Sequence, residues 1–242
     1  AEDHIRGKEN MATMSTSNFQ KLVNTGYHHQ YMSNVMQLNN GNGTYSEISS
    51  LAGIAKTDWS WAPLIADFDN DGYNDIFVTN GIQNDLSNQD FRKHMKSNIR
   101  NRKKVTLEEA INMMPSNILS NYIFQNNKDL TFKNTTKNWG LDSKVNSNGA
   151  VYADLDNDGD LDLVVNNQEK KASVYKNNSK NNFVTFELKG SEKNNFGIGA
   201  KITVYANELK QSKTHFVSRG YQSSIGNKLH FGLDNQHKID SI

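Results

Sequence analysis

The chain has 242 residues, of which 35% are hydrophobic, and its mean hydropathy is -0.76. Its net charge is +1, so bulk charge does not indicate a nucleic-acid partner. It contains no cysteine, which excludes disulfides, thiolate catalysis and cysteine-based zinc sites. About one residue in seven is asparagine, which favours tight turns and tolerates left-handed backbone.

Targeting signals are missing from the sequence as given. Residues 1–30 carry no signal-peptide pattern, and no apolar run approaches the roughly 20 residues of a membrane span. An alternating strand pattern begins at residues 237–242, so we expect both ends to be cut from a longer protein. In such a fragment a missing signal does not decide where the protein resides.

The first organised unit covers residues 35–81 and predicts four short strands. Apolar, aromatic and β-branched residues alternate there with Asn, Gly and Asp turns, a pattern typical of strands. The predicted strands lie near residues 35–39, 44–48, 62–67 and 75–79. The last two are joined by an aspartate-rich loop, from Asp67 to Asp75.

Residues 82–120 interrupt this strand pattern and predict a short helical insertion near residues 85–118. Helix formers dominate residues 88–100, and Thr106 with Glu109 predicts a capping box that opens a second short helix. The basic cluster at residues 100–104 is interpreted as a solvated surface, with a phosphate or nucleic-acid patch as the lesser alternative.

A second unit at residues 122–167 repeats the first with an offset of 87 residues. Its strands are expected near residues 122–126, 130–134, 149–154 and 161–165, and its aspartate loop runs from Asp154 to Asp162. The segment that leads into each repeat begins a third time at residues 174–178. Four strands per repeat is the blade pattern of a β-propeller, so the predicted fold class is all-β with propeller blades over residues 1–180.

The sequence pattern changes after residue 180, and no aspartate loop occurs in that part of the chain. Four segments alternate like strands with one buried face, at residues 183–188, 200–205, 215–218 and 228–233. We expect residues 181–242 to form a second, truncated β domain with a sandwich-like arrangement. The glycines at 197 and 199 are interpreted as a tight turn, because the full nucleotide-binding glycine motif and its helix are missing.

The two aspartate loops share the pattern D-x-D-x-D-G-x-x-D, which suits calcium. This ion takes six to eight oxygen ligands, and carboxylates at positions 1, 3 and 5 converge when the chain curls around it. Glycine at position 6 permits the sharp turn, the position-7 carbonyl is a backbone ligand, and the acid at position 9 closes the site. The predicted ligands are Asp67, Asp69, Asp71, Tyr73 and Asp75 in the first loop, and Asp154, Asp156, Asp158, Asp160 and Asp162 in the second.

These loops are not EF-hands, which need a bidentate Glu at position 12 and a following helix. Position 12 here is Val78 or Val165, within strand sequences. The alternative is an acidic turn without metal, but four carboxylates within nine residues repel one another. Two aligned copies favour two calcium ions, and magnesium is disfavoured by its preference for fewer protein ligands. The Asp160 side chain is expected to point outward, because Tyr73 takes its place in the first loop.

At these loops the sequence resembles the FG-GAP/VCBS repeat family, the calcium-loop blades of integrin-α-like β-propellers. The FG-GAP dipeptides themselves are not preserved, so the match is to the VCBS branch. Residues 196–200, 219–224 and 229–233 resemble the ASPIC/UnbV domain. Proteins with this pairing are similar to the cartilage acidic protein family and to large secreted bacterial proteins.

The resemblance implies a secreted or cell-surface module for adhesion, whose ligand would be a glycan or an extracellular protein, with calcium in a structural role. No catalytic residues are predicted, and the chain is not expected to be an enzyme. The alternatives left open are a non-catalytic part of a secreted polysaccharide-active enzyme and a purely structural spacer.

Histidine and tryptophan residues offer weaker candidates. The seven histidines show no nucleophile-elbow motif nearby. His215 and His230 fall at predicted strand positions, where they pack or face solvent. Trp59, Trp61 and Trp139 could form a sugar-stacking platform, but their places before the loops favour a role in the core of each repeat. The run from Arg219 to Tyr221 could bind a partner, but it is interpreted as a structural turn of the second domain.

Overall fold

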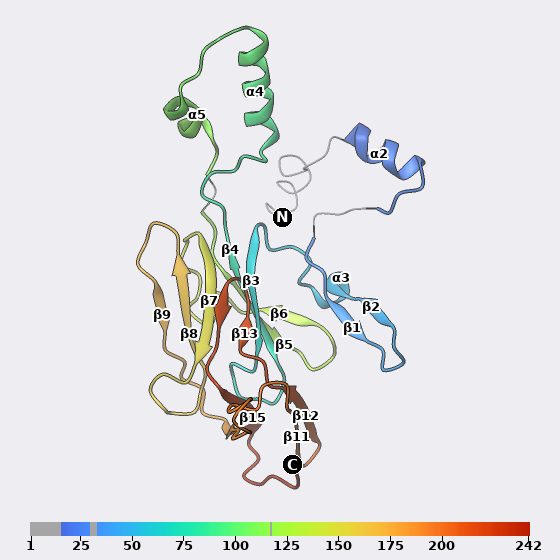
Figure 1. Cartoon of the computed structure of the whole chain (residues 1–242), viewed down its shortest axis with the longest axis vertical. Helices are drawn as coiled ribbons and strands as arrows, with labels where there is room; N and C mark the ends of the chain where they lie inside the picture. Colours follow the sequence, from blue (N-terminus) through green and yellow to red (C-terminus); the bar gives the residue numbers. More distant parts are fainter. Residues whose placement is uncertain (1–15, 30–32, 117) are drawn as a thin grey trace.

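The computed structural model describes residues 16–29, 33–116 and 118–242, and these residues form an all-β architecture with a few helices (Figure 1). The segment expected to lack a signal peptide, residues 1–30, lies partly outside them. The helices are α2 (Thr16–Asn24), α3 (Ser49–Ala52), α4 (Gln89–Arg100) and α5 (Leu107–Met113). The strands are β1 (Gln37–Asn39), β2 (Tyr45–Glu47), β3 (Ser60–Ala66), β4 (Asp75–Asn80), β5 (Tyr122–Asn126), β6 (Phe132–Asn134), β7 (Ser147–Ala153), β8 (Asp162–Asn167), β9 (Ser173–Tyr175), β10 (Asn182–Glu187), β11 (Lys201–Ala206), β12 (Leu209–Thr214), β13 (Ser218–Arg219), β14 (Ser223–Ser224) and β15 (Lys228–Asp234).

The eight strands predicted for the two repeat units are confirmed as β1 to β8, but their grouping differs from the prediction. Strands β3 to β6 form one four-stranded antiparallel sheet, β7 to β9 form a three-stranded sheet, and β1 with β2 form a separate hairpin. Each of the two larger sheets therefore takes strands from two successive copies. The sequence repeat predicts where strands occur along the chain. The pairing of β4 with β5 across the insertion decides which strands share a sheet.

The described residues do not close into a propeller ring, and their sheets instead stack side by side. Strand β4 is buried along its whole length, because successive side chains point to opposite faces of a strand and both faces are covered. Phe77 packs with Leu64 of its own sheet and with Leu163 of the neighbouring sheet in one cluster. Ile76 and Val78 pack with residues around α3 in another.

Two hairpin turns show that the sequence repeat is also a structural repeat. The Asn40 side chain donates to Thr44 Oγ1 over 2.9 Å, and Asn127 donates to Thr131 Oγ1 over the same distance. In both turns the threonine amide donates to an acceptor two residues earlier, over 3.0 Å. Asx turns of this kind fix a tight reversal, so the two copies fold alike at this level of detail.

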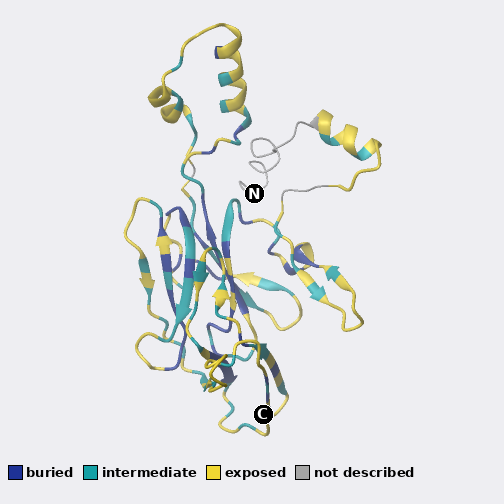
Figure 2. Cartoon of the chain, in the orientation of Figure 1, coloured by how far each residue is buried: buried dark blue, intermediate teal, exposed yellow. Residues whose placement is uncertain are grey.

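The two helices predicted between the repeats are observed as α4 and α5, and both project from the sheets (Figure 1). The expected capping box is confirmed: the Thr106 hydroxyl accepts from the Glu109 amide, and the Glu109 carboxylate accepts from the Thr106 amide. Figure 2 shows both helices largely exposed, in contrast to the strands below them. Ile99 and Leu107 are 72% and 77% exposed.

After residue 180 the antiparallel pair of β10 with β15 and the hairpin of β11 with β12 pack around their own apolar cluster, and β13 with β14 form a small separate hairpin. The predicted strands at residues 183–188, 200–205 and 228–233 are confirmed. The predicted strand at residues 215–218 is wrong, because the chain reverses at Asn207, with φ of 54°, and forms β12 instead. Polar residues dominate β12, so hydrophobic alternation does not reveal it.

None of the helices in the described residues is long and apolar enough to cross a membrane.

Candidate metal centres

Each aspartate loop joins the two strands of one hairpin, β3 to β4 in the first case and β7 to β8 in the second. The loops follow the same backbone path. The residue at position 4 has a positive φ in both, 58° at Asn70 and 60° at Asn157. The glycine at position 6 does too, 88° at Gly72 and 89° at Gly159. Glycine adopts this conformation without steric cost, which explains its place in both loops.

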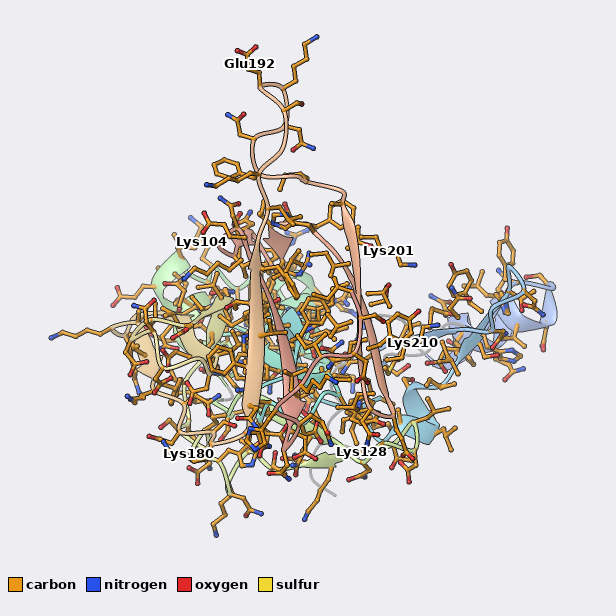
Figure 3. All side chains as sticks on the ribbon, turned by 90° about the horizontal axis from the view of Figure 1, so that it is seen from below. Lys104, Lys128, Lys180, Glu192, Lys201 and Lys210 are labelled. Carbon is orange, nitrogen blue, oxygen red and sulfur yellow. The ribbon has the colours of Figure 1, made fainter. Side chains whose placement is uncertain are left out.

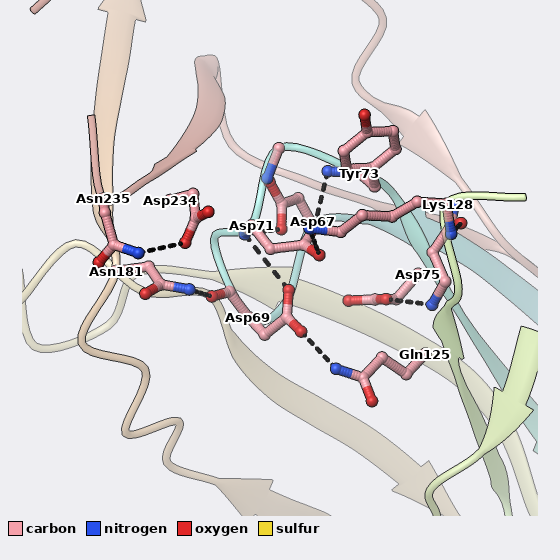
Figure 4. Close-up of polar contacts among 12 residues, drawn as sticks. Asp67, Asp69, Asp71, Tyr73, Asp75, Gln125, Lys128, Asn181, Asp234 and Asn235 are labelled. Carbon is pink, nitrogen blue, oxygen red and sulfur yellow. Dashed lines mark hydrogen bonds and ion pairs between the residues drawn. The ribbon is translucent and has the colours of Figure 1, made fainter. Parts of the chain in front are cut away.

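The first loop brings three of its five predicted ligands together. One carboxylate oxygen each from Asp67, Asp69 and Asp71 lies within 4.8 Å of the other two. Asp67 is completely buried, and its two oxygens accept from the amides of Asp71 at 3.0 Å and Gly72 at 2.8 Å. Figure 4 shows Asp69 approached from opposite sides by Gln125 and Asn181.

The second loop brings together Asp154, Asp156 and Asp162, again with one oxygen each within 4.8 Å of the others. Asp158 lies outside this group, where it accepts from the Asp160 amide at 3.3 Å and pairs with Lys176 at 3.4 Å. The first loop differs, because Asp75 at position 9 lies outside its group while Asp71 at position 5 belongs to it.

The acid at position 9 also accepts hydrogen bonds from backbone amides, which the sequence pattern did not reveal. Asp75 accepts from the Phe68 amide at 3.1 Å and from the Asn126 amide at 2.9 Å. Asp162 accepts in the same way from Leu155 and Asn177, both at 2.9 Å. Each closing acid therefore ties the start of its loop to the next strand of the sheet.

A side chain from that next strand also reaches the acid at position 3. Gln125 donates to Asp69 at 2.8 Å, and Lys176 bonds to Asp156. Both residues precede the asparagine that contacts the closing acid. Residues 124–127 and 175–178 are similar in sequence, but only the fold shows that these two segments border the loops.

The expectation that Asp160 points outward is wrong. This residue is 2% exposed, whereas Tyr73, its counterpart in the first loop, is 37% exposed. Burial and the nearby Asp158 carboxylate raise the pKa of Asp160 to about 6. The chain at residues 179–183 covers this part of the second loop, and a Cβ on the adjacent Gly159 would lie 1.7 Å from the Phe183 ring.

The first loop concentrates negative charge away from water. Burial raises the pKa of Asp67 to about 7 and that of Asp75 to about 8, and neighbouring aspartates add to both shifts. Burial also raises the pKa of Asp69. Lys128 partly offsets the charge with an ion pair to Asp71 at 3.0 Å. A cation among these carboxylates would favour their ionised forms.

The residues present fit a hard divalent cation. The converging atoms are carboxylate oxygens, which such cations prefer. In the second loop Asp154 Oδ1 is buried and has no hydrogen-bond partner within the described part of the chain. A buried polar atom of this kind is costly unless it is satisfied, and a metal ion bound between Asp154 and Asp156 would satisfy it.

The tryptophan and histidine candidates lie in different parts of the structure. Trp139 packs against the main apolar cluster, which confirms its predicted core role. Trp59 and Trp61 lie 6.5 Å apart in a tilted arrangement. His215 and His230 are both buried, at 2% and 6% exposure.

Comparison with known families places both loops inside recognised repeats. A model described as an FG-GAP-like repeat matches residues 22–78 and 116–165, which include the two aspartate loops. A model described as ASPIC and UnbV matches residues 190–242. No curated protein matches the chain significantly. The chain therefore contains FG-GAP-like repeats followed by an ASPIC and UnbV domain.

Proposed function

We propose that the chain is a calcium-binding, β-propeller-like module in which two calcium ions hold the loops in shape. The observation that carries this proposal is the convergence of three carboxylates in each of the two aspartate loops. Calcium fits better than magnesium, because the loops offer several carboxylates within a curved backbone and calcium accepts a larger, more flexible oxygen shell.

A structural role follows from where the loops lie. Asp75 and Asp162 each bond to the backbone of the next strand. The Asn70 side chain donates to the Gly159 carbonyl at 3.1 Å, so the first loop also contacts the second. A metal that orders either loop would therefore order the contacts between neighbouring sheets.

The biological role that we propose is binding at the cell surface or outside the cell, without catalysis. The family resemblance supports adhesion to a glycan or an extracellular protein. The projecting helices α4 and α5 add a physical argument for a protein partner, because Ile99 and Leu107 are largely exposed. Both side chains lie on helices that project from the sheets, where a protein partner could reach them.

Calorimetric titration of the metal-stripped chain with calcium tests the proposal. We expect two equivalents to bind. Asp156→Ala should lower the stoichiometry to one, because this acid belongs to the second cluster. Asp142→Ala, which removes an exposed aspartate outside both loops, should leave two. Absence of calcium binding, or two equivalents in Asp156→Ala, would contradict the ligand assignment.

The second site should bind calcium more tightly after Lys176→Gln. The Lys176 ammonium pairs with Asp156 and Asp158, so it competes with the metal for the same charges. The first site has a glutamine, Gln125, at the equivalent position. Because the lysine is exposed and water screens such pairs, we expect a gain of only about two- to fivefold.

The matched control for this measurement is Lys180→Gln, an exposed lysine labelled in Figure 3. It removes the same charge four residues away and should change the affinity much less. Equal gains in the two variants would indicate a general charge effect and would contradict a specific competition by Lys176.

A further inference from the structure

A cavity lined by apolar and polar residues lies between the repeat sheets and the C-terminal β domain, and none of the aspartates of the two loops lines it. Its volume is about 340 Å³. One wall comes from β3 and β7, through Ile65 and Tyr152, and the other comes from residues 213–216 and 228–230. This size is within the range of small-molecule sites.

The charge of this cavity is one-sided. Lys213, Arg219 and Lys228 line it, and no aspartate or glutamate of the described residues does. Burial lowers the pKa of Lys213 to about 8; the Asp67 charge opposes this shift and the Arg219 charge adds to it. Like charges brought together in a poorly solvated place repel one another, so the cavity favours an anion.

Two buried histidines add hydrogen-bonding groups. His215 is 2% exposed, and within the described chain neither of its ring nitrogens has a hydrogen-bond partner. His230 bonds through Nε2 to Asn70 at 2.6 Å, while its Nδ1 is likewise unsatisfied. Buried polar groups that lack a hydrogen-bond partner destabilise the folded protein. Both histidines line the cavity, where a polar ligand would satisfy them.

The hairpin that carries Arg219 is firmly anchored. Strands β13 and β14 pair Arg219 with Ser223, and the Tyr221 ring lies 5.0 Å from that of Trp61. A Cβ on Gly220 would lie 3.1 Å from Ala62 of β3, and this glycine has φ of 62°. The turn is structural, as the sequence suggested, and it also fixes the guanidinium at the wall of the cavity.

The hydrogen bonds that Lys213 and Arg219 donate to backbone carbonyls use only some of the N–H donors of these two side chains. Lys213 donates to the His230 carbonyl at 2.6 Å, and Arg219 donates to the Ser218 carbonyl at 2.9 Å. A lysine ammonium has three donors and an arginine guanidinium five, in a fork that matches planar and tetrahedral oxyanions.

We propose that this cavity binds a small organic oxyanion, whose carboxylate, sulfate or phosphate group is held by Arg219 and Lys213. The histidines donate to or accept from the polar groups next to that oxyanion. Ile65, Ile225 and Phe216 at the walls contact the rest of the ligand. This site does not require that the aspartate loops bind calcium, and it gives the ASPIC and UnbV segment a binding task of its own.

Calorimetric titration of the whole chain, with calcium present, tests the proposal. The probes are sodium sulfate, sodium phosphate and sodium glucuronate at constant ionic strength, and glucose is the neutral comparator. We expect saturable one-to-one binding of at least one anion and none of glucose. Inorganic anions alone would indicate a sulfate or phosphate group in the ligand, and glucuronate would indicate a carboxylate. Absence of saturable binding by all three anions would overturn the proposal.

Variants separate this site from general attraction to a basic surface. Arg219→Gln should weaken anion binding at least tenfold, and Lys228→Gln, at the exposed rim, should weaken it less. Lys201→Gln is the matched control and should bind like the wild type; this exposed lysine is the first residue of β11 and is labelled in Figure 3. Equal binding by Arg219→Gln and the wild type would contradict the assignment.

Nuclear magnetic resonance of the wild-type chain keeps the proposal testable if Arg219→Gln fails to fold. Saturation with the bound anion should shift the ring nitrogen signals of His215, while those of the exposed His28 remain in place. Unchanged His215 signals at saturation would show that the anion binds elsewhere and would overturn the assignment.

Discussion

Replacing Gly232 by alanine is expected to destabilise the protein by about 3 kcal/mol. A Cβ at this position would lie 2.1 Å from Asp67 Oδ2 and 2.5 Å from Asn70 Cα in the first loop. The main chain at Asn70 cannot yield easily, because its carbonyl accepts from the Asp234 amide at 2.7 Å. Either β15 or the loop must move, so the variant should also weaken calcium binding at the first site more than at the second.

Urea unfolding of Gly232→Ala beside Gly226→Ala measures this effect. A Cβ on Gly226 would meet no atom within 4 Å, and this glycine has no left-handed backbone. The control therefore makes the same chemical change without the collision. Similar unfolding midpoints for the two variants would show that β15 does not pack closely on the first loop in solution.

The metal-free protein is expected to become less stable as the pH rises from about 5.5 to 8.5. In the folded state the pKa of Asp67 is raised to about 7 and that of Asp75 to about 8, mainly by burial. An unfolded chain loses these protons near pH 4. Between pH 4 and 8 the folded state therefore holds more protons, and raising the pH favours unfolding.

Thermal melts in chelator at several pH values test this dependence. We expect a fall of at least about 5 °C across the range, since 1 kcal/mol corresponds to about 2–4 °C in a chain of this size. Asp75→Asn, which lacks the titrating proton, should show a flatter profile. Metal-free stability that rises over the same range would contradict the burial of these carboxylates.

The sequence revealed the parts of this fold that depend on local patterns. The spacing of the aspartates and glycines in each loop, the capping box at Thr106 and most strands follow from short-range chemistry. The two loops could be aligned because their residues repeat with a fixed offset.

What the sequence did not reveal depends on contacts between distant segments. Gln125 and Lys176 reach the position-3 acids only because the next strand of each sheet passes beside the loop. Asp160 is buried beside Gly159, where the distant Phe183 ring of β10 packs against the loop. Strand β12 lacks hydrophobic alternation and is defined by its pairing with β11. No local pattern encodes these relations.

The first loop connects the parts of the described structure. Asn70 contacts the second loop through the Gly159 carbonyl and the C-terminal domain through His230. Asn181 and Ser179, which lead into that domain, donate to the Asp69 carbonyl at 2.8 Å each. Loss of order in this loop should therefore weaken both sheets of the repeats and their contact with the ASPIC and UnbV domain.

Thermal unfolding of the wild-type chain at pH 8, in excess calcium and in excess chelator, tests the central claim most directly. Two occupied sites should raise the melting temperature by about 10 °C over the metal-free protein. Adding calcium back to the chelated sample should restore that value, and equimolar magnesium should restore little of it. An identical melting temperature with calcium and with chelator would contradict a structural role for calcium in the two aspartate loops.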